Sequence, residues 1–81
     1  MTRLPRVSGK DVVQALRRGG YELSHVRGSH YYLKKPGIAA LVVVPVHGNR
    51  DLPAGTLRSI LHQASLATED LIALLNDSAE G

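Results

Sequence analysis

GSHYYLKK, residues 28–35, predicts a β-strand, because apolar and polar side chains alternate along it. Successive side chains of a strand point to opposite faces. Tyr31 and Leu33 therefore share one face, and the opposite face carries His30, Tyr32 and Lys34. With Leu33 in the core, His30 points to solvent, and one face of the predicted sheet is left open.

Two further strands are predicted beside this one. Residues 21–27 have an imperfect strand pattern, because Tyr21 and Leu23 share one face whereas Val26 falls on the other. We expect a bulge or an early end of the strand there. The apolar, β-branched segment before Pro45 predicts a third strand, which Pro45 ends because it has no amide hydrogen to donate. A three-stranded antiparallel meander is the simplest arrangement.

Helices are predicted before and after the strands in the sequence. Ser8 is expected to be the N-cap of the first helix, with Asp11 in its first turn, and Gly19-Gly20 provides the exit. A second helix follows Pro53, and Thr68 is expected to cap a short third one. The order predicts an α+β fold of α-β-β-β-α type with a short C-terminal helix.

Length and composition narrow the class of protein. The 81 residues fit a single domain, residues 1–81, with a frayed tail over residues 76–81. Because the chain has no cysteine, we exclude disulfides and thiolate metal sites, and we expect a reducing, cytoplasmic location. No membrane span or targeting signal is predicted, since no long apolar stretch occurs. The net charge of +3, with most basic residues before Pro36, is compatible with an anionic partner such as nucleic acid.

His30 is the strongest candidate for chemistry. An unperturbed histidine has a pKa close to neutral, so this residue type can accept or release a proton at cytoplasmic pH. Tyr32 and Lys34 share its predicted face, and Arg27 and Lys35 are close in sequence. An RNA-cleaving surface needs such neighbours, because cations hold phosphates and aromatic rings stack on unpaired bases.

The other histidines carry weaker signals. His47 stands beside Gly48 in the polar segment after the third predicted strand. It has two open interpretations, a second acid/base group or a residue that orders the loop by hydrogen bonding. His25 and His62 are expected at the surface. The histidine spacing contains no i, i+4 pair on a helix, so no metal site is predicted.

Five short segments occur in a distinctive order: VSGK at residues 7–10, GGY at 19–21, GSH at 28–30, VPVHGN at 44–49 and GTLRSIL at 55–61. In this order and spacing, from about Leu4 to Leu75, the chain resembles the HicA family of small toxins of toxin-antitoxin pairs. The resemblance implies a fold like the double-stranded-RNA-binding domain. It also implies endoribonuclease activity on messenger RNA, which arrests translation, and neutralisation by a HicB-family antitoxin.

The family's catalytic histidine corresponds to His30. Cleavage without metal or cofactor fits these side chains, because RNA carries its own nucleophile, the 2′-hydroxyl. Gly28 and Ser29 are expected to shape the backbone beside His30. Many relatives have Gly where Ser65 stands, so we expect the second helix to end less cleanly here.

The sequence also supports a second interpretation. A fold of this type can also bind structured RNA by its shape and phosphates without cutting it. His30 would then be an ordinary polar contact, as an exposed strand histidine more often is. A protein that only docks an antitoxin is a third class. Cleavage and binding measured separately distinguish the three.

Overall fold

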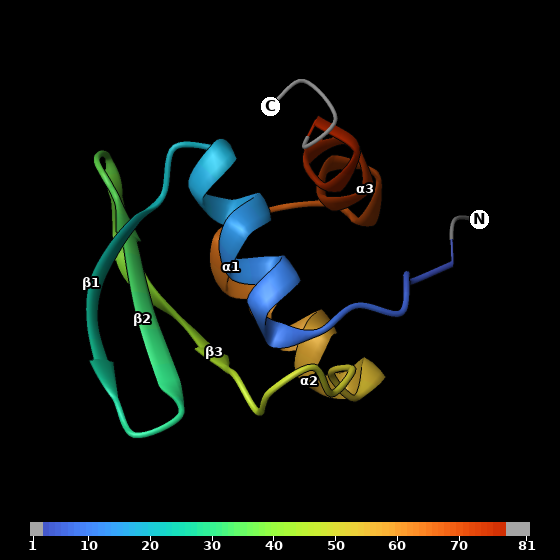
Figure 1. Cartoon of the computed structure of the whole chain (residues 1–81). Helices are drawn as coiled ribbons and strands as arrows, with labels where there is room; N and C mark the ends of the chain where they lie inside the picture. Colours follow the sequence, from blue (N-terminus) through green and yellow to red (C-terminus); the bar gives the residue numbers. More distant parts are fainter. Residues whose placement is uncertain (1–2, 78–81) are drawn as a thin grey trace.

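The structure, a computed structural model, describes residues 3–77 and confirms the predicted α+β order. Its elements are α1 (Gly9–Arg18), β1 (Glu22–Arg27), β2 (His30–Lys35), β3 (Ile38–Pro45), α2 (Ala54–Ala64) and α3 (Thr68–Asn76). The three strands form one antiparallel sheet in the order β1-β2-β3. Figure 1 shows that the helices lie on one side of the sheet and leave its other face bare.

The core lies between the sheet and the helices, as the alternation of β2 predicted. Leu33 is fully buried there, and Tyr31 is partly buried against the same core. The largest fully buried side chains come from all three helices and from β2 and β3: Leu16, Leu33, Leu57, Ile60, Leu71, Val12, Val42 and Val44. Removing this apolar surface from water is the main term that stabilises so small a domain.

The start of α1 is fixed by a reciprocal cap and by a close backbone contact. The amide of Asp11 donates to Ser8 Oγ (3.1 Å), and the amide of Ser8 donates to Asp11 Oδ2 (3.3 Å), which confirms the predicted N-cap. Gly9 then lies against the carbonyl group of Pro45, where a Cβ atom would overlap the oxygen. This close approach joins α1 to the end of β3.

The end of α1 is joined to both other helices. Gly20 has a φ of 99°, so the predicted glycine exit is confirmed in the left-handed conformation that a Cβ atom disfavours. The Tyr21 hydroxyl donates to the carbonyl of Ala64 at the end of α2 (2.9 Å), and Arg18 donates to the carbonyl of Leu74 in α3 (2.8 Å). Burial raises the pKa of the Tyr21 hydroxyl above 10.0.

Two expectations about the helix ends are wrong. α2 ends cleanly, because Ser65 adopts the left-handed conformation (φ 58°). The amide of Ser65 donates to the carbonyl of His62 and the amide of Leu66 to the carbonyl of Leu61, as in a Schellman motif. Thr68 is the first residue of α3 and not its cap. Ala67 is the N-cap, and its amide donates to Asp70 Oδ2 (2.8 Å), the half of a capping box that needs no hydroxyl at the N-cap.

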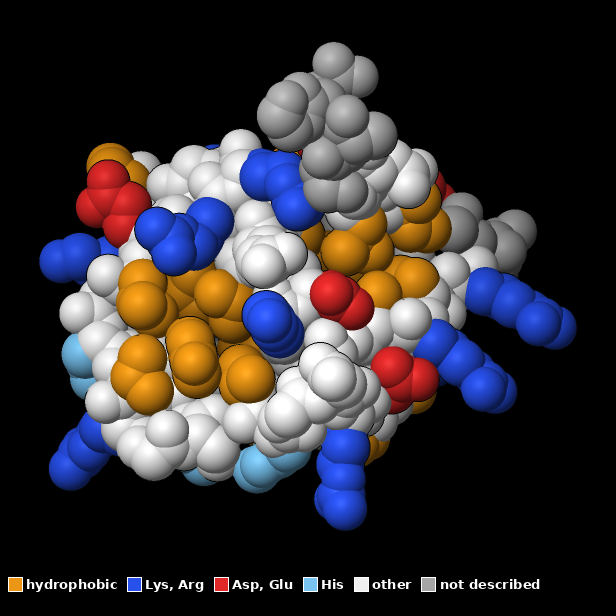
Figure 2. Space-filling view, viewed as in Figure 1, with side chains coloured by type: hydrophobic (Ala, Val, Ile, Leu, Met, Phe, Trp, Pro, Cys, Tyr) orange, Lys and Arg blue, Asp and Glu red, His pale blue; other side chains and the backbone are white. Residues whose placement is uncertain are grey.

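The predicted irregularity of β1 is confirmed as a bulge. The register shifts between Leu23, which pairs with Leu33, and His25, which pairs with Tyr32. The bulge returns Val26 to the face of Leu23, so both point to the helix side. They are nevertheless 37% and 45% exposed, because the helices cover β1 incompletely. Figure 2 shows hydrophobic side chains exposed in this region, beside α1.

α3 ends one residue before the last described residue. Asn76 is the last residue of α3 and Asp77 its C-cap, while residues 78–81 of the expected tail lie outside the described residues. No helix within residues 3–77 has the length and apolar content that a membrane crossing requires.

Candidate functional site

His30 begins β2 on the bare face of the sheet, where its side chain is exposed. It pairs in register with Arg27 of β1 on one side and with Pro45 of β3 on the other. Directly opposed residues of neighbouring strands share a face, so the guanidinium of Arg27 is the cation placed beside the imidazole. The sequence predicted the exposure of His30, and of the three cations it offered, Arg27, Lys34 and Lys35, the register places only Arg27 beside the imidazole.

The turn before His30 consists of Gly28 and Ser29. Gly28 has a φ of 57° and occupies the first of two turn positions, the pattern of a type II′ hairpin. A Cβ atom there would meet open space, so the need for glycine is conformational. The carbonyl of Ser29 accepts a hydrogen bond of 2.7 Å from the amide of Val46. This bond attaches the loop after β3 to the turn that carries His30.

The loop after β3 brings His47 to the same end of the sheet. The amide of Arg50 donates to the His47 carbonyl (3.1 Å), and the amide of Leu52 donates to the Val7 carbonyl (2.8 Å), so backbone bonds hold the loop. The His47 side chain is exposed and makes no hydrogen bond to other residues of the described range 3–77. Its imidazole therefore contributes no hydrogen bond to the order of this loop.

A small hollow lies beside this loop, at the start of α2. Its volume is about 270 Å³, and it is lined by His47, Arg50, Thr56 and neighbouring residues. Arg50 was not among the site residues predicted from the sequence. The only signal was its place three residues after His47, in a loop whose path depends on contacts with residues far away in the sequence.

Tyr32 lies on the bare face two residues after His30. Its ring stacks on that of His25, with the centroids 4.3 Å apart and the planes 10° from parallel. His25 was expected to be an ordinary surface residue, and its place beside Tyr32 was missed. The available signal was the broken alternation of β1, because a bulge of one residue changes the face of every side chain that follows it.

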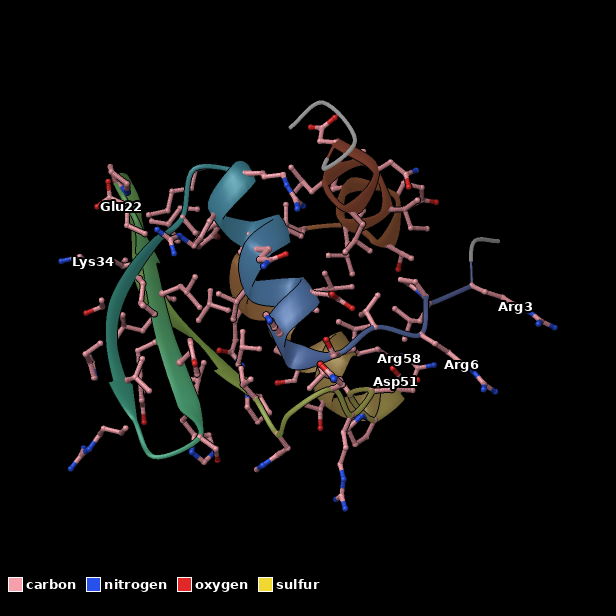
Figure 3. The ribbon with its side chains drawn as sticks, in the orientation of Figure 1. Arg3, Arg6, Glu22, Lys34, Asp51 and Arg58 are labelled. Atoms are coloured by element: carbon pink, nitrogen blue, oxygen red, sulfur yellow. The ribbon has the colours of Figure 1, made fainter. Side chains whose placement is uncertain are left out.

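The two lysines are separated from His30. Lys34 shares the bare face but pairs with Glu22 near the opposite end of the sheet from the turn at Gly28. Figure 3 shows Glu22 and Lys34 together at that end. Lys35 is turned to the helix side, and its Nζ lies 5.5 Å from the centre of the Tyr21 ring in a cation–π contact. The structure brings neither lysine next to the imidazole.

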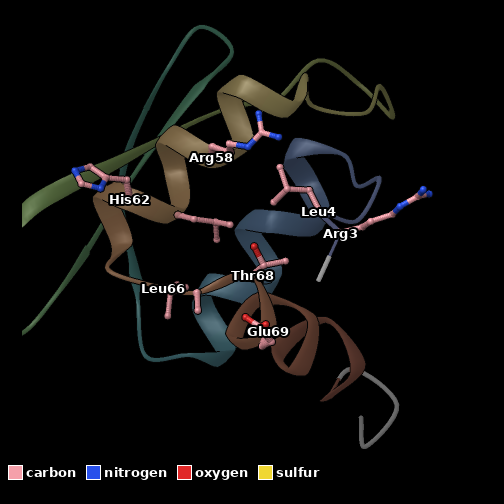
Figure 4. A pocket seen from close by; sticks show the side chains of 9 residues that line it. Arg3, Leu4, Arg58, His62, Leu66, Thr68 and Glu69 are labelled. Atoms are coloured by element: carbon pink, nitrogen blue, oxygen red, sulfur yellow. The ribbon is translucent and has the colours of Figure 1, made fainter. Parts of the chain in front are cut away.

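A larger hollow, of about 740 Å³, lies on the helix side between the N-terminal segment, α2 and α3. Figure 4 shows Leu4, Arg58, Leu66 and Thr68 around it. None of its lining residues belongs to the sheet, so it is separate from the surface of His30. Its ionisable lining residues are Arg3, Arg58, His62 and Glu69, and none of them is a residue predicted for the chemistry.

Metal ligands do not gather within residues 3–77. No group of three or more His, Cys, Asp or Glu side chains in this part of the chain has the arrangement that could hold a metal ion. The chemistry available at the candidate site is therefore that of an exposed imidazole, a neighbouring guanidinium, a second imidazole on the adjacent loop and a stacked pair of rings.

Comparison with protein families gives a match. The model of the family described as HicA toxin of bacterial toxin-antitoxin systems matches residues 9–66, well over half of the chain. The matched range begins at the first residue of α1 and extends past the end of α2, so it includes the whole sheet and the loop of His47. Comparison with curated proteins gives no match.

Proposed function

The chain belongs to the HicA toxin family of bacterial toxin-antitoxin systems, and from this we propose that it is an endoribonuclease that cleaves messenger RNA without a metal ion or cofactor. As a toxin of such a pair it has an antitoxin partner. The proposal adds the reaction, the substrate and the residues that carry them.

The observation that supports the proposal most strongly is the exposure of His30 on the bare face of the sheet, in register with Arg27. A buried imidazole would be closed to a polymer such as RNA. The imidazole of His30 is exposed beside a guanidinium, so a phosphodiester can reach it. No helix covers this face of the sheet, so an RNA strand can lie along the face (Figure 1). Arginine binds phosphate well because its planar fork of N–H donors matches the phosphate oxygens.

The proposed reaction begins with His30 as a general base. Its imidazole accepts the proton of the RNA 2′-hydroxyl, whose oxygen forms a bond to phosphorus while the bond from phosphorus to the 5′-oxygen breaks. The leaving 5′-oxygen takes a proton from a general acid. The products are a 2′,3′-cyclic phosphate and a 5′-hydroxyl. The guanidinium of Arg27 stabilises the charge that develops on the phosphoryl oxygens.

We assign the second proton transfer to His47. Its side chain is exposed on a loop that the Ser29–Val46 hydrogen bond attaches to the turn of His30. Because the described residues give this imidazole no hydrogen-bond partner, the loop-ordering interpretation has less support than the acid/base one. Gly28 and Ser29 set the backbone at the site, and Tyr32, whose ring is stacked on His25, takes part in RNA binding.

The lysines take a more distant part. Lys34 lies on the face of His30, about 13 Å along β2 at the usual rise per residue, so it is placed for a neighbouring phosphate and not for the one that reacts. Lys35 reaches RNA only if it leaves the Tyr21 ring. We expect His30→Ala to abolish cleavage. Substitution of either lysine should weaken RNA binding without changing the cleavage step.

One comparison tests the enzyme assignment directly. Purified wild type, His30→Ala and His62→Ala are incubated with a defined transcript in EDTA, and cleavage and binding are scored separately. His62 is an exposed histidine of α2 on the hollow at the helix side, and it serves as the matched control. We expect cleavage by wild type and His62→Ala but not by His30→Ala. Binding without cleavage by all three proteins would instead support a non-catalytic RNA-binding module.

The antitoxin partner is proposed to be HicB-like and to cover His30. The bare face carries Arg27 and Lys34 against the single carboxylate of Glu22 within the described sheet, so a partner with acidic groups is complementary to it. Binding of the antitoxin should weaken as salt rises and should exclude RNA. A complex that cleaves RNA at the rate of the free toxin would contradict this occlusion.

A further inference from the structure

The stacked rings of His25 and Tyr32 are placed by an irregularity of β1. Leu23 points to the helix side, so in a regular strand Ser24 would take the bare face and His25 would return to the helix side. The bulge between Leu23 and His25 moves His25 to the face of Tyr32 and His30. Bulges often redirect a side chain next to an active site.

A second contact holds the His25 ring. Ser24 Oγ lies 3.0 Å from His25 Nδ1, within hydrogen-bonding distance. The ring is therefore fixed on one edge by Ser24 and on one face by the Tyr32 ring, although the residue is exposed. Such a ring loses little conformational freedom when a ligand binds to it.

The other face of the His25 ring is accessible. Tyr32 is flanked in register by His25 on β1 and by Val43 on β3, so its two sides are occupied. β1 is an edge strand, and all of its residues are exposed. The face of His25 turned away from Tyr32 therefore borders solvent at the edge of the sheet. A flat, aromatic ligand can extend the stack there.

This stacking surface is next to the proposed catalytic pair. His25 and Tyr32 form one cross-strand row, and Arg27 and His30 form the row two residues away. Two residues of a strand span about 6.5 Å. A phosphate held between Arg27 and His30 is thus close enough for a base of the adjoining nucleotide to reach the His25 ring.

We propose that His25, supported by Tyr32, is a stacking site for one unpaired base beside the cleaved bond, and that the substrate of this surface is single-stranded RNA. The proposal rests on the proposed nuclease function. A base inside a duplex is stacked on both faces and paired at its edge, so it has no face to offer. An unpaired base stacks on aromatic side chains with little regard to its identity.

The test measures binding in a chain that cannot cut. The full chain with His30→Ala is compared with three versions that also carry His25→Ala, His25→Phe or His62→Ala. Each is titrated into a fluorescein-labelled single-stranded oligoribonucleotide, and into the same strand annealed to its complement, with anisotropy as the readout. Thermal unfolding of each variant verifies that the fold is kept.

We expect His25→Ala to weaken binding of the single strand by about 5- to 150-fold, the usual effect of losing one stacked base. His25→Phe should restore most of the affinity, because it keeps a flat ring, and His62→Ala should have no effect. Affinity for the duplex should be the same in all four proteins. Equal losses on single strand and duplex, no loss with His25→Ala, or no recovery with His25→Phe would overturn the proposal.

A parallel cleavage assay of the wild type separates the two proposals. If the wild type cuts no RNA but the His25 variants behave as expected, the nuclease proposal fails and the stacking site stands. If the wild type cuts RNA and the His25 variants bind the single strand equally, only the stacking site fails.

Discussion

The carbonyl oxygen of Ser29 accepts a 2.7 Å hydrogen bond from the amide of Val46. Through it, the turn that precedes His30 and the loop that carries His47 meet at one end of the sheet. The loop is also held at its far side, where the amide of Leu52 donates to the carbonyl of Val7. Two histidines far apart in the sequence are thereby kept on neighbouring, ordered segments.

His47→Ala tests whether His47 takes part in the cleavage reaction together with His30. If His30 and His47 act as base and acid, the cleavage rate of the wild type follows a bell-shaped pH profile, because one imidazole must be neutral and the other protonated. The variant should lose about 10²- to 10⁴-fold in rate and one limb of the profile. Single-turnover cleavage over a pH series measures both. An unchanged rate, or a loss confined to RNA affinity, would exclude the acid/base assignment.

Gly9→Ala tests the contact between α1 and the end of β3. A Cβ atom at Gly9 would overlap the carbonyl oxygen of Pro45, a backbone atom that cannot turn aside. We expect a loss of about 1–3 kcal/mol in the free energy of unfolding, as for other overpacked sites. Urea denaturation measures it. Gly55→Ala is the matched control, because its Cβ meets open space in α2 and the better helix propensity should add up to about 1 kcal/mol. Equal stability of the two variants would contradict the contact.

Ser65→Gly tests the exit of α2. Ser65 has a φ of 58°, a conformation that costs a residue with a Cβ atom roughly 1–2 kcal/mol. Glycine relieves this cost but loses more chain entropy on folding, which offsets part of the relief. We therefore expect the free energy of unfolding to rise by up to about 1 kcal/mol. Thermal unfolding measures the gain, with Gly20→Ala, at a φ of 99°, as the opposite change and an expected loss. A less stable Ser65→Gly would show that the serine side chain stabilises the exit.

Because of Tyr21, we expect the folded protein to lose stability in alkali. Its hydroxyl is buried (3% exposed) and donates to the Ala64 carbonyl, and burial raises its pKa in the folded protein above the unfolded value of 10.0. Below pH 10 both states keep the proton. Above it the unfolded chain releases the proton first, so the free energy of unfolding falls as pH rises.

Urea denaturation at neutral and strongly alkaline pH checks this prediction. The informative comparison is with Tyr21→Phe, which removes this one hydroxyl and keeps the ring. That variant should be less stable at neutral pH, because the Ala64 carbonyl loses its donor. Its stability should fall less above pH 10 than that of the wild type. Parallel pH dependences would contradict the role assigned to the buried hydroxyl.

Features decided by local sequence were predicted well. The Ser8 cap, the glycine exit after α1, the alternation of β2 and the end of β3 at Pro45 each depend on a few neighbouring residues, and the structure confirms them. The exposure of His30 followed from the same alternation. The start of α3 was displaced by one residue, because Ala67 is its N-cap and is held by the carboxylate of Asp70 within the helix.

Features that depend on contacts between distant parts of the chain could not be predicted from the sequence. The broken alternation of β1 indicated a bulge, but only the pairing with β2 shows that it turns His25 to the face of Tyr32. The position of Lys35 over Tyr21 depends on where α1 ends relative to the sheet. The placement of His47 beside the His30 turn depends on a hydrogen bond between residues 17 positions apart, Ser29 and Val46.

The chemistry of the RNA ends tests the central claim most directly. A defined transcript is incubated with the purified chain in EDTA, and the new ends are analysed by mass spectrometry. If His30 activates the 2′-hydroxyl, the products carry 2′,3′-cyclic phosphate and 5′-hydroxyl ends, which should be absent with His30→Ala. Products ending in a 3′-hydroxyl, or the same cyclic ends formed at full rate by His30→Ala, would contradict it.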